Sequence, residues 1–187
     1  MNTFYMVEMH YPDSEDRAKF DAFYAKHISM LLGIDGFLSA QRYRCTHRAE
    51  APYLAVYRLR DPAVMESENY TSRAGRNSVD PAFRAKMTNW DRNLLRGELA
   101  DMDVAEDGWL QVIDCLTPES PPLPEGFTPL EVVGLDATIA QRGVRLGRSG
   151  TPPDLSSPPA GWRVRSFRPI HAPRYPAASG AGLRIRG

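Results

Sequence analysis

The clearest hydrophobic pattern of the chain lies between residues 20 and 43. Apolar side chains recur there at a spacing near 3.6, which predicts an amphipathic helix. They are Phe20, Phe23, Tyr24, Ile28 and Leu31. We expect the helix to begin after an N-cap at Ser14 and to run to about Leu32. Gly33 and Gly36 then end it, and a strand follows over 37–46.

The pattern predicts further strands over 3–11, 53–59 and 108–116. A broken helix is expected over 62–99, with an interruption at 72–78 and a restart at Asp80-Pro81. Its second half places Phe83, Met87, Trp90 and Leu94 on one stripe. The order is strand, helix, strand, strand, helix, strand, which is typical of a ferredoxin-like α+β fold with a four-stranded antiparallel sheet.

The composition changes after residue 116. Residues 117–126 contain four of the chain's 16 prolines, and the segment beyond 148 is rich in Pro, Ser, Gly and Arg. Short strands are expected near 130–135 and 162–170, and no repeat of the first unit is evident. We therefore expect a domain over 1–116 and a Pro/Arg-rich C-terminal extension over 117–187, partly ordered where it lies on the domain or on a partner.

Alternation along the strands separates two faces of the predicted sheet. The face expected under the helices holds Tyr5, Val7, Met9, Leu38, Ala40, Leu54, Val56, Leu110 and Val112. The other face holds Phe4, Met6, Glu8, His10, Phe37, Ser39, Gln41, Tyr43, Tyr53, Ala55, Tyr57, Trp109, Gln111 and Ile113. Many rings with a few polar groups are typical of a ligand cavity. So large an apolar face also predicts a homodimer joined sheet to sheet.

His27 lies on the apolar stripe of the predicted helix, between Tyr24 and Ile28. A histidine on a buried face can have its pKa tuned for proton transfer. The alternative is a hydrogen-bonded core histidine without a catalytic role.

The chain resembles the dimeric α/β-barrel superfamily over residues 3–116, and most nearly its EthD-like and related uncharacterised bacterial branch. The matching residues are Phe20-x-x-Phe-Tyr-x-x-His27, Leu31-Leu32, Gly36-Phe37, Arg42-Tyr43 and Tyr53-Leu-Ala-Val-Tyr57. The superfamily includes muconolactone-type isomerases, cofactor-independent oxygenases, polyketide cyclases, dehydratases and heme-handling proteins. The resemblance implies two ferredoxin-like units paired face to face, with His27 at a pocket edge. Lys26 departs from the acidic residue that relatives often carry there.

Further candidates for catalysis come from the ring-rich face. Glu8 could act as a general acid if unpaired, or pair with Arg42, Arg58, His10 or His27; a salt bridge across a dimer interface is the alternative. His10, one pleat from Glu8 on the same face, is a further catalytic candidate, and a solvent-exposed role near the end of the strand is its alternative. Tyr43 and Tyr57 could donate hydrogen bonds to a substrate carbonyl or enolate, or serve only in packing.

Candidates for substrate binding are mostly arginines. Arg42 and Arg58 could clamp a carboxylate, and Arg73 and Arg76 flank Gly75 in a loop that could bind an anion or act as a lid; solvated arginines and a plain connector are the alternatives. Three more side chains are expected to line the cavity: Gln41, Trp109 and Gln111. Cys45 could pair with His47 as a nucleophile, which is the weakest of these hypotheses.

Several function classes lack support in the sequence. The 23 basic and 23 acidic residues balance, so nothing indicates nucleic acid or acidic lipid as a partner. The two cysteines, Cys45 and Cys115, permit a disulfide, but buried free thiols are favoured and suit a cytoplasmic protein. No metal-ligand spacing, phosphate loop, hydrolase motif or transmembrane run is present.

We therefore expect a cytoplasmic enzyme that needs neither metal nor organic cofactor and acts on a small unsaturated or aromatic-derived organic acid. An isomerase that shifts or rotates a double bond by proton transfer is the main hypothesis. A cofactor-free monooxygenase or a lyase of the same fold is one alternative. A non-enzymatic small-ligand or heme-binding module is another.

Overall fold

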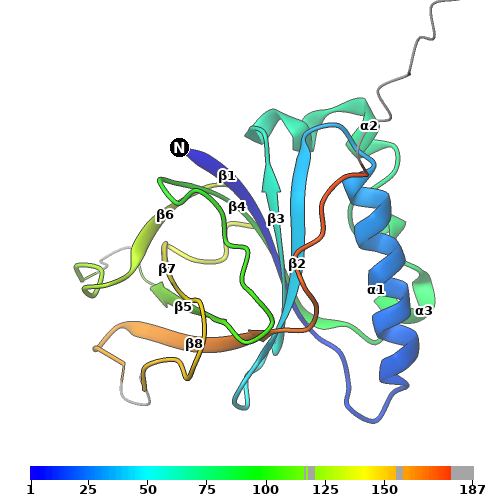
Figure 1. Ribbon diagram of the computed structural model, residues 1–187. Coiled ribbons are helices and arrows are strands. Elements are labelled where there is room, and N and C mark those ends of the chain that lie inside the picture. Colours follow the sequence, from blue (N-terminus) through cyan, green and yellow to red (C-terminus); the bar gives the residue numbers. More distant parts are fainter. Residues whose placement is uncertain (116, 118–120, 155–157, 178–187) are drawn as a thin grey trace, which may run out of the picture.

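Strands pair edge to edge into a closed antiparallel barrel in the computed structural model, which describes residues 1–115, 117, 121–154 and 158–177 (Figure 1). Within these residues the barrel has eight strands in the order β1-β3-β2-β8-β5-β7-β6-β4. Their bounds are β1 Asn2–His10, β2 Phe37–Cys45, β3 Tyr53–Leu59, β4 Thr88–Gly97, β5 Trp109–Cys115, β6 Thr128–Leu135, β7 Gln141–Gly147 and β8 Trp162–Pro169.

The helices cover one side of the barrel. Helix α1 spans Arg17–Leu32 and lies outside the wall formed by β1 to β4, opposite β5 to β8 (Figure 1). Its N-cap is Asp16, whose side chain accepts a hydrogen bond from the Lys19 backbone N–H, so Ser14 was the wrong cap. Four short helices follow between β3 and β4: η1 Pro62–Glu66, α2 Glu68–Thr71, η2 Arg76–Ser78 and α3 Pro81–Arg84. None of the helices in the described residues is long and apolar enough to cross a membrane.

The predicted ferredoxin-like fold with a four-stranded sheet is wrong. About half of the restarted helix expected over 80–99 is strand β4. Only Trp90 and Leu94 of the predicted stripe lie on β4, where a spacing of four residues also puts them on one face of a strand, and both pack in the cluster under α1. The strand expected over 108–116 is β5, which lies between β8 and β7 in the ring and not beside the strands under α1.

The predicted extension also has a different role. It supplies β6, β7 and β8, which close the barrel within a single chain. The apolar face that predicted a sheet-to-sheet homodimer is therefore covered by strands of the same chain. That argument for a homodimer no longer applies.

The two halves of the chain repeat one topology. Strands β1 to β4 are ordered β4-β1-β3-β2, and β5 to β8 are ordered β8-β5-β7-β6. In the second half the connections are shorter, and no helix lies within their described residues. The barrel thus holds two related four-stranded units, of which only the first carries α1.

Three apolar clusters make up the core of the described residues. One lies between α1 and the outer face of the sheet, a second fills the barrel, and a third consists of Ile113, Cys115, Phe127 and Trp162. On β1 the predicted faces are confirmed, since Tyr5, Val7 and Met9 lie under α1. On β3 they are reversed: Tyr53, Ala55 and Tyr57 lie under α1, while Leu54 and Val56 face the interior. On β5, Leu110 and Val112 also lie inside the barrel.

Candidate active site

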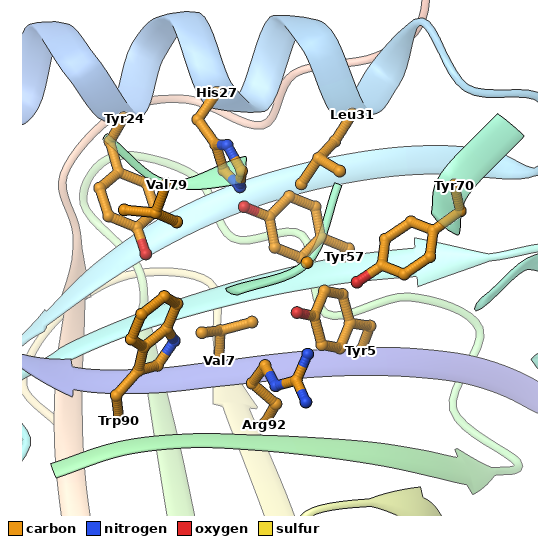
Figure 2. A pocket seen from close by; sticks show the side chains of 11 residues that line it. Tyr5, Val7, Tyr24, His27, Leu31, Tyr57, Tyr70, Val79, Trp90 and Arg92 are labelled. Atoms are coloured by element: carbon orange, nitrogen blue, oxygen red, sulfur yellow. The ribbon is translucent and has the colours of Figure 1, made fainter. Parts of the chain in front are cut away.

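A small pocket lies between α1 and the outer face of the sheet (Figure 2). We call it the α1 pocket. Its lining is Tyr5, Val7, Tyr24, His27, Leu31, Tyr57, Tyr70, Gly75, Val79, Trp90 and Arg92. Strands β1, β3 and β4 supply its floor, α1 its roof, and the α2–α3 region one side. Its volume is about 20 Å³, enough for about one water molecule, so the pocket holds almost no free space.

Buried tyrosines dominate the floor. Tyr5 and Tyr57 are 5% and 1% exposed, and their rings stack with centroids 5.4 Å apart. Burial raises the pKa of Tyr5, and the neighbouring Tyr70 and Tyr57 raise it further. Burial also raises the pKa of Tyr57. Both phenols therefore remain protonated at any physiological pH and can act as hydrogen-bond donors.

The side chain of His27 extends from α1 into the pocket. Figure 2 shows its ring pointing down from the helix toward the side where the Tyr57 hydroxyl lies. The rings of Phe23 and Tyr24 flank it, with centroids 5.8 and 5.9 Å away. Burial lowers the pKa of His27 to about 4. The imidazole is therefore neutral near pH 7 and has a lone pair that can accept a proton.

Two arginines share one carboxylate at the pocket's edge. Arg76 Nη2 lies 2.5 Å from Asp136 Oδ2, and Arg92 Nη2 lies 3.3 Å from Asp136 Oδ1. The Arg92 backbone N–H also donates to Asp136 over 2.9 Å. Two positive charges against one negative charge leave this edge electropositive. Among the described residues, the buried Nε of Arg92 has no hydrogen-bond partner.

Trp90 closes the same edge of the pocket. Its buried indole N–H also lacks a partner among the described residues. Arg76 stacks 5.5 Å from the Trp90 ring centroid and donates to the Trp90 carbonyl over 2.7 Å. The pocket thus combines a neutral base, phenol and indole donors, and surplus positive charge. This arrangement can remove a proton from a bound molecule and stabilise the resulting anion.

Of the residues predicted to be catalytic, the structure brings His27 and Tyr57 together and separates the others. Glu8 is 4% exposed inside the barrel, bound by Arg142 and, over 2.6 Å, by Arg165. Tyr43 is also interior, and its hydroxyl lies 2.6 Å from both the Gln41 side-chain oxygen and the Met102 carbonyl. His10 ends β1, with Nδ1 3.3 Å from the Thr88 hydroxyl.

The residues predicted to bind substrate are dispersed. Only Arg76 reaches the edge of the α1 pocket, through Trp90 and Asp136. Gln41 donates from its amide to the Val104 carbonyl over 2.7 Å and so fixes the segment before β5. Gln111 donates to the Pro153 carbonyl over 2.7 Å, on the far side of the barrel.

The remaining predicted arginines and Trp109 have structural partners. Arg42 is 3% exposed, pairs with Asp21 over 2.9 Å and lies 4.2 Å from the Tyr24 ring centroid. Arg58 donates to the Ala100 carbonyl over 3.2 Å, and Arg73 donates to Asn69 over 3.0 Å. Trp109 is 7% exposed and packs beside Arg145.

Both cysteines are buried. Cys45 Sγ lies 3.6 Å from His47 Nε2, but burial raises the pKa of this thiol, which disfavours the thiolate that a nucleophile requires. No group of three or more His, Cys, Asp or Glu side chains within the described part of the chain could hold a metal ion.

Sequence reasoning missed four residues of the pocket. Tyr5 was assigned to the core, Tyr70 was not singled out, and Trp90 and Arg92 lay in a segment predicted to be helical. If β4 is recognised as a strand, Trp90 and Arg92 fall on one face by simple alternation. This alternation is the signal in the sequence that could have identified both residues.

No family model matches the sequence, and no curated protein matches it. Two solved structures resemble the fold. An anthrone oxidase-like protein is 10% identical, with 94% of each chain covered and a TM-score of 0.55. A candidate monooxygenase from Lactobacillus acidophilus NCFM is 9% identical, with 90% of this chain and 94% of that chain covered and a TM-score of 0.51.

At these identities the comparisons show the fold alone. Neither description mentions the EthD-like branch that the sequence resemblance favoured. Neither similar structure is described as an isomerase, so that part of the sequence-based expectation is not carried further.

Proposed function

We propose that this protein is a cofactor-independent monooxygenase whose reaction takes place in the α1 pocket. The observation that carries the proposal is His27, a neutral imidazole enclosed with phenol donors and the electropositive Arg92 edge. The descriptions of the two similar structures, one oxidase-like and one a candidate monooxygenase, support the same class. The substrate would be a small aromatic-derived compound with a CH₂ group that is acidified by conjugation with a carbonyl.

The first step is proton transfer. His27 takes a proton from the activated carbon, and the negative charge moves to the substrate oxygen. Arg92, the Trp90 indole N–H and the tyrosine hydroxyls stabilise that oxygen. Although burial lowers the pKa of His27, an anion next to the ring favours the imidazolium and raises this pKa. The pocket can therefore stabilise both products of the proton transfer.

The second step uses dioxygen and no external reductant. The carbanion's electron pair forms the new C–O bond, O₂ is reduced to the peroxide level, and the peroxide takes the proton from the His27 imidazolium. The O–O bond then breaks as the second proton leaves the carbon, which gives a carbonyl and water. The balance is R₂CH₂ + O₂ → R₂C=O + H₂O, in which the substrate carbon supplies all four electrons that reduce O₂.

A substrate can enter only if the pocket opens. Its closed volume of about 20 Å³ excludes an aromatic compound. Gly75 and Val79 line one side of the pocket and belong to residues 72–79, most of which are exposed. Arg76, in the same segment, binds the Trp90 carbonyl and the Asp136 carboxylate. Release of Arg76 would let the segment move away from the sheet.

Oxygen uptake with anthrone tests the proposal, because the CH₂ group of anthrone is acidified by conjugation with its carbonyl through the rings and its oxidation to anthraquinone follows the stoichiometry above. We expect one O₂ consumed per anthraquinone formed, faster than without protein and unchanged after exhaustive chelation. Turnover that continues without oxygen, or that requires added flavin or metal, would contradict the proposal. A Soret band in the purified protein would support the heme-binding alternative instead.

A further inference from the structure

Two carboxylates lie directly opposite each other on the interior face of the barrel. In the register of the antiparallel pair, Glu8 of β1 faces Asp91 of β4. Like charges in facing positions repel each other and destabilise a sheet. Glu8 is compensated, because Arg142 and Arg165 bind its two oxygens. Within the described part of the chain, the Asp91 carboxylate has no hydrogen bond and no ion pair, so the fold leaves its charge uncompensated.

The surroundings of Asp91 also disfavour its charge. Asp91 is half-buried, and burial, Glu8 and Asp136 all raise its pKa. Arg76 and Arg163 act in the opposite sense but do not outweigh them. A carboxylate in this position costs the folded protein free energy, which a cation bound beside it would recover.

Asp91 lines a pocket at the end of the barrel where β1 ends and β8 begins. We call it the barrel-end pocket. Its volume is about 490 Å³, within the range of small-molecule sites. Strands β1 and β4, strand β8, and the connection between β2 and β3 form its walls, and every lining residue is one that the structure describes. Its charged lining residues are Glu8, Glu50, Asp91, Arg48, Arg163 and Arg165.

The β8 wall offers N–H donors to a ligand. Arg165 is 4% exposed and binds Glu8 and Asp114, but its buried Nε has no partner among the described residues. The Arg163 side chain is 41% exposed, and over the same residues its one polar contact is to Asp114, over 3.3 Å. Strands β8 and β4 lie on opposite sides of the ring. The pocket therefore has a free carboxylate on one wall and arginine donors on the opposite wall.

We propose that the barrel-end pocket is a second ligand site, which binds a short aliphatic amino acid with its ammonium and carboxylate groups at opposite ends. The ammonium group pairs with Asp91, and the carboxylate accepts hydrogen bonds from Arg163. The small apolar lining residues contact the chain between them; they are Ala49, Ala51 and Val164. This site does not depend on the monooxygenase activity proposed for the α1 pocket.

A series of linear probes tests the site. The ω-amino acids from 4-aminobutyrate to 8-aminooctanoate carry both charges, while the alkylamine and the fatty acid of each length carry one. In isothermal titration calorimetry with the unmodified protein, we expect saturable binding of at least one of these amino acids at one site per chain. Its two singly charged analogues should bind about fivefold more weakly or worse, because each lacks one charge contact.

Substitutions at the two charged residues assign the two ends of the ligand. Asp91→Asn should weaken the amino acid and the alkylamine about fivefold and leave the fatty acid unchanged. Arg163→Gln should weaken the amino acid and the fatty acid and leave the alkylamine unchanged. Asp91→Asn should also have a melting temperature equal to that of the unmodified protein or higher, because it removes one of two facing like charges.

Glu131→Gln is the matched control, since Glu131 is a carboxylate on β6 that does not line the pocket, and it should leave all three probes unaffected. Circular dichroism checks that each variant is folded; if Arg163→Gln is not, Asp91→Asn decides alone. The proposal would be overturned if no member of the series bound saturably, or if the amino acid bound no better than its singly charged analogues. Unchanged affinities in Asp91→Asn would overturn it as well, and so would a lower melting temperature of that variant, which would show that the fold needs this carboxylate.

Discussion

Glu8 and Asp114 occupy equivalent positions on β1 and β5, and the same two arginines bind both carboxylates. Arg142 Nε lies 2.7 Å from Asp114 while its Nη2 binds Glu8; Arg165 lies 2.6 Å from Glu8 and 2.7 Å from Asp114. All four residues are at most 4% exposed. This cluster of buried charges therefore links the two halves of the barrel across its interior.

Breaking this cluster should destabilise the fold strongly. In Glu8→Gln, Arg142 and Arg165 would lose one of their two carboxylates and stay buried, which we expect to cost about 3–5 kcal/mol in the free energy of unfolding. Urea denaturation measures it. Glu131→Gln is the control, since the Glu131 side chain is 59% exposed and, within the described part of the chain, pairs only with Arg96 over 3.2 Å; about 1 kcal/mol or less is expected. Equal losses in both variants would contradict this account of the cluster.

The free energy of unfolding should decrease in two stages as the pH falls. The pKa of His27 is about 4 in the fold against an ordinary 6.5, so between these values the unfolded chain binds a proton that the folded protein does not. Stability should therefore decrease as the pH falls from 6.5 to about 4. His27→Gln should reduce the slope of the free energy of unfolding in this range, as urea titrations at several pH values would show; burial also lowers the pKa of His171, which accounts for the slope that remains.

The second stage belongs to the carboxylates. Burial opposes their ionisation, but Arg142 and Arg165 outweigh it and lower the pKa of both Glu8 and Asp114. Their stabilisation is complete above the ordinary values of 4.5 and 3.8 and is lost as the pH falls through the lowered ones. This stage should remain in His27→Gln.

Two tyrosines that looked alike in the sequence should behave differently. Tyr43→Phe removes a hydroxyl that lies 2.6 Å from the Met102 carbonyl inside the barrel, so we expect a loss of about 1–3 kcal/mol in stability with turnover retained. Tyr57→Phe removes a hydroxyl from the α1 pocket and should lower kcat with little effect on stability. Thermal melts and steady-state rates on one substrate separate the two. A Tyr43→Phe variant that is stable but inactive would contradict this distinction.

Strands β1 and β3 show why the sequence predicted one pair of sheet faces correctly and reversed another. On β1 the two faces differ in polarity, since Glu8 and His10 share one of them, and the faces were assigned correctly. On β3 both rows are apolar or aromatic, so alternation could not tell Tyr57 from Val56, and the faces were reversed. Helix α1 and His27 were identified because a long 3.6-residue period has few other interpretations.

Local patterns in the sequence could not predict contacts between distant parts of the chain. Glu8 was expected to pair with nearby arginines, but its partners are 134 and 157 residues away. They lie in the segment whose proline content suggested an extension. Proline-rich connections between short strands were thus mistaken for a lack of structure.

The segment that closes the α1 pocket should be released by one substitution. Arg76→Ala removes the contacts to Trp90 and Asp136, and amide hydrogen exchange over residues 72–79 should then become faster while α1 is unchanged. Arg73→Ala is the matched control on the same segment, because Arg73 pairs only with Asn69 among the described residues. Equal exchange in the two variants would show that Arg76 does not hold the segment.

The role of His27 is the central claim, and oxygen uptake by His27→Gln with anthrone tests it most directly. Glutamine keeps a hydrogen-bonding group but cannot accept a proton near neutral pH. We predict a folded variant with a melting temperature close to that of the unmodified protein and a kcat lower by about 10²–10⁴-fold, the range for a lost general base. A folded His27→Gln protein that consumes oxygen at the full rate would contradict the account.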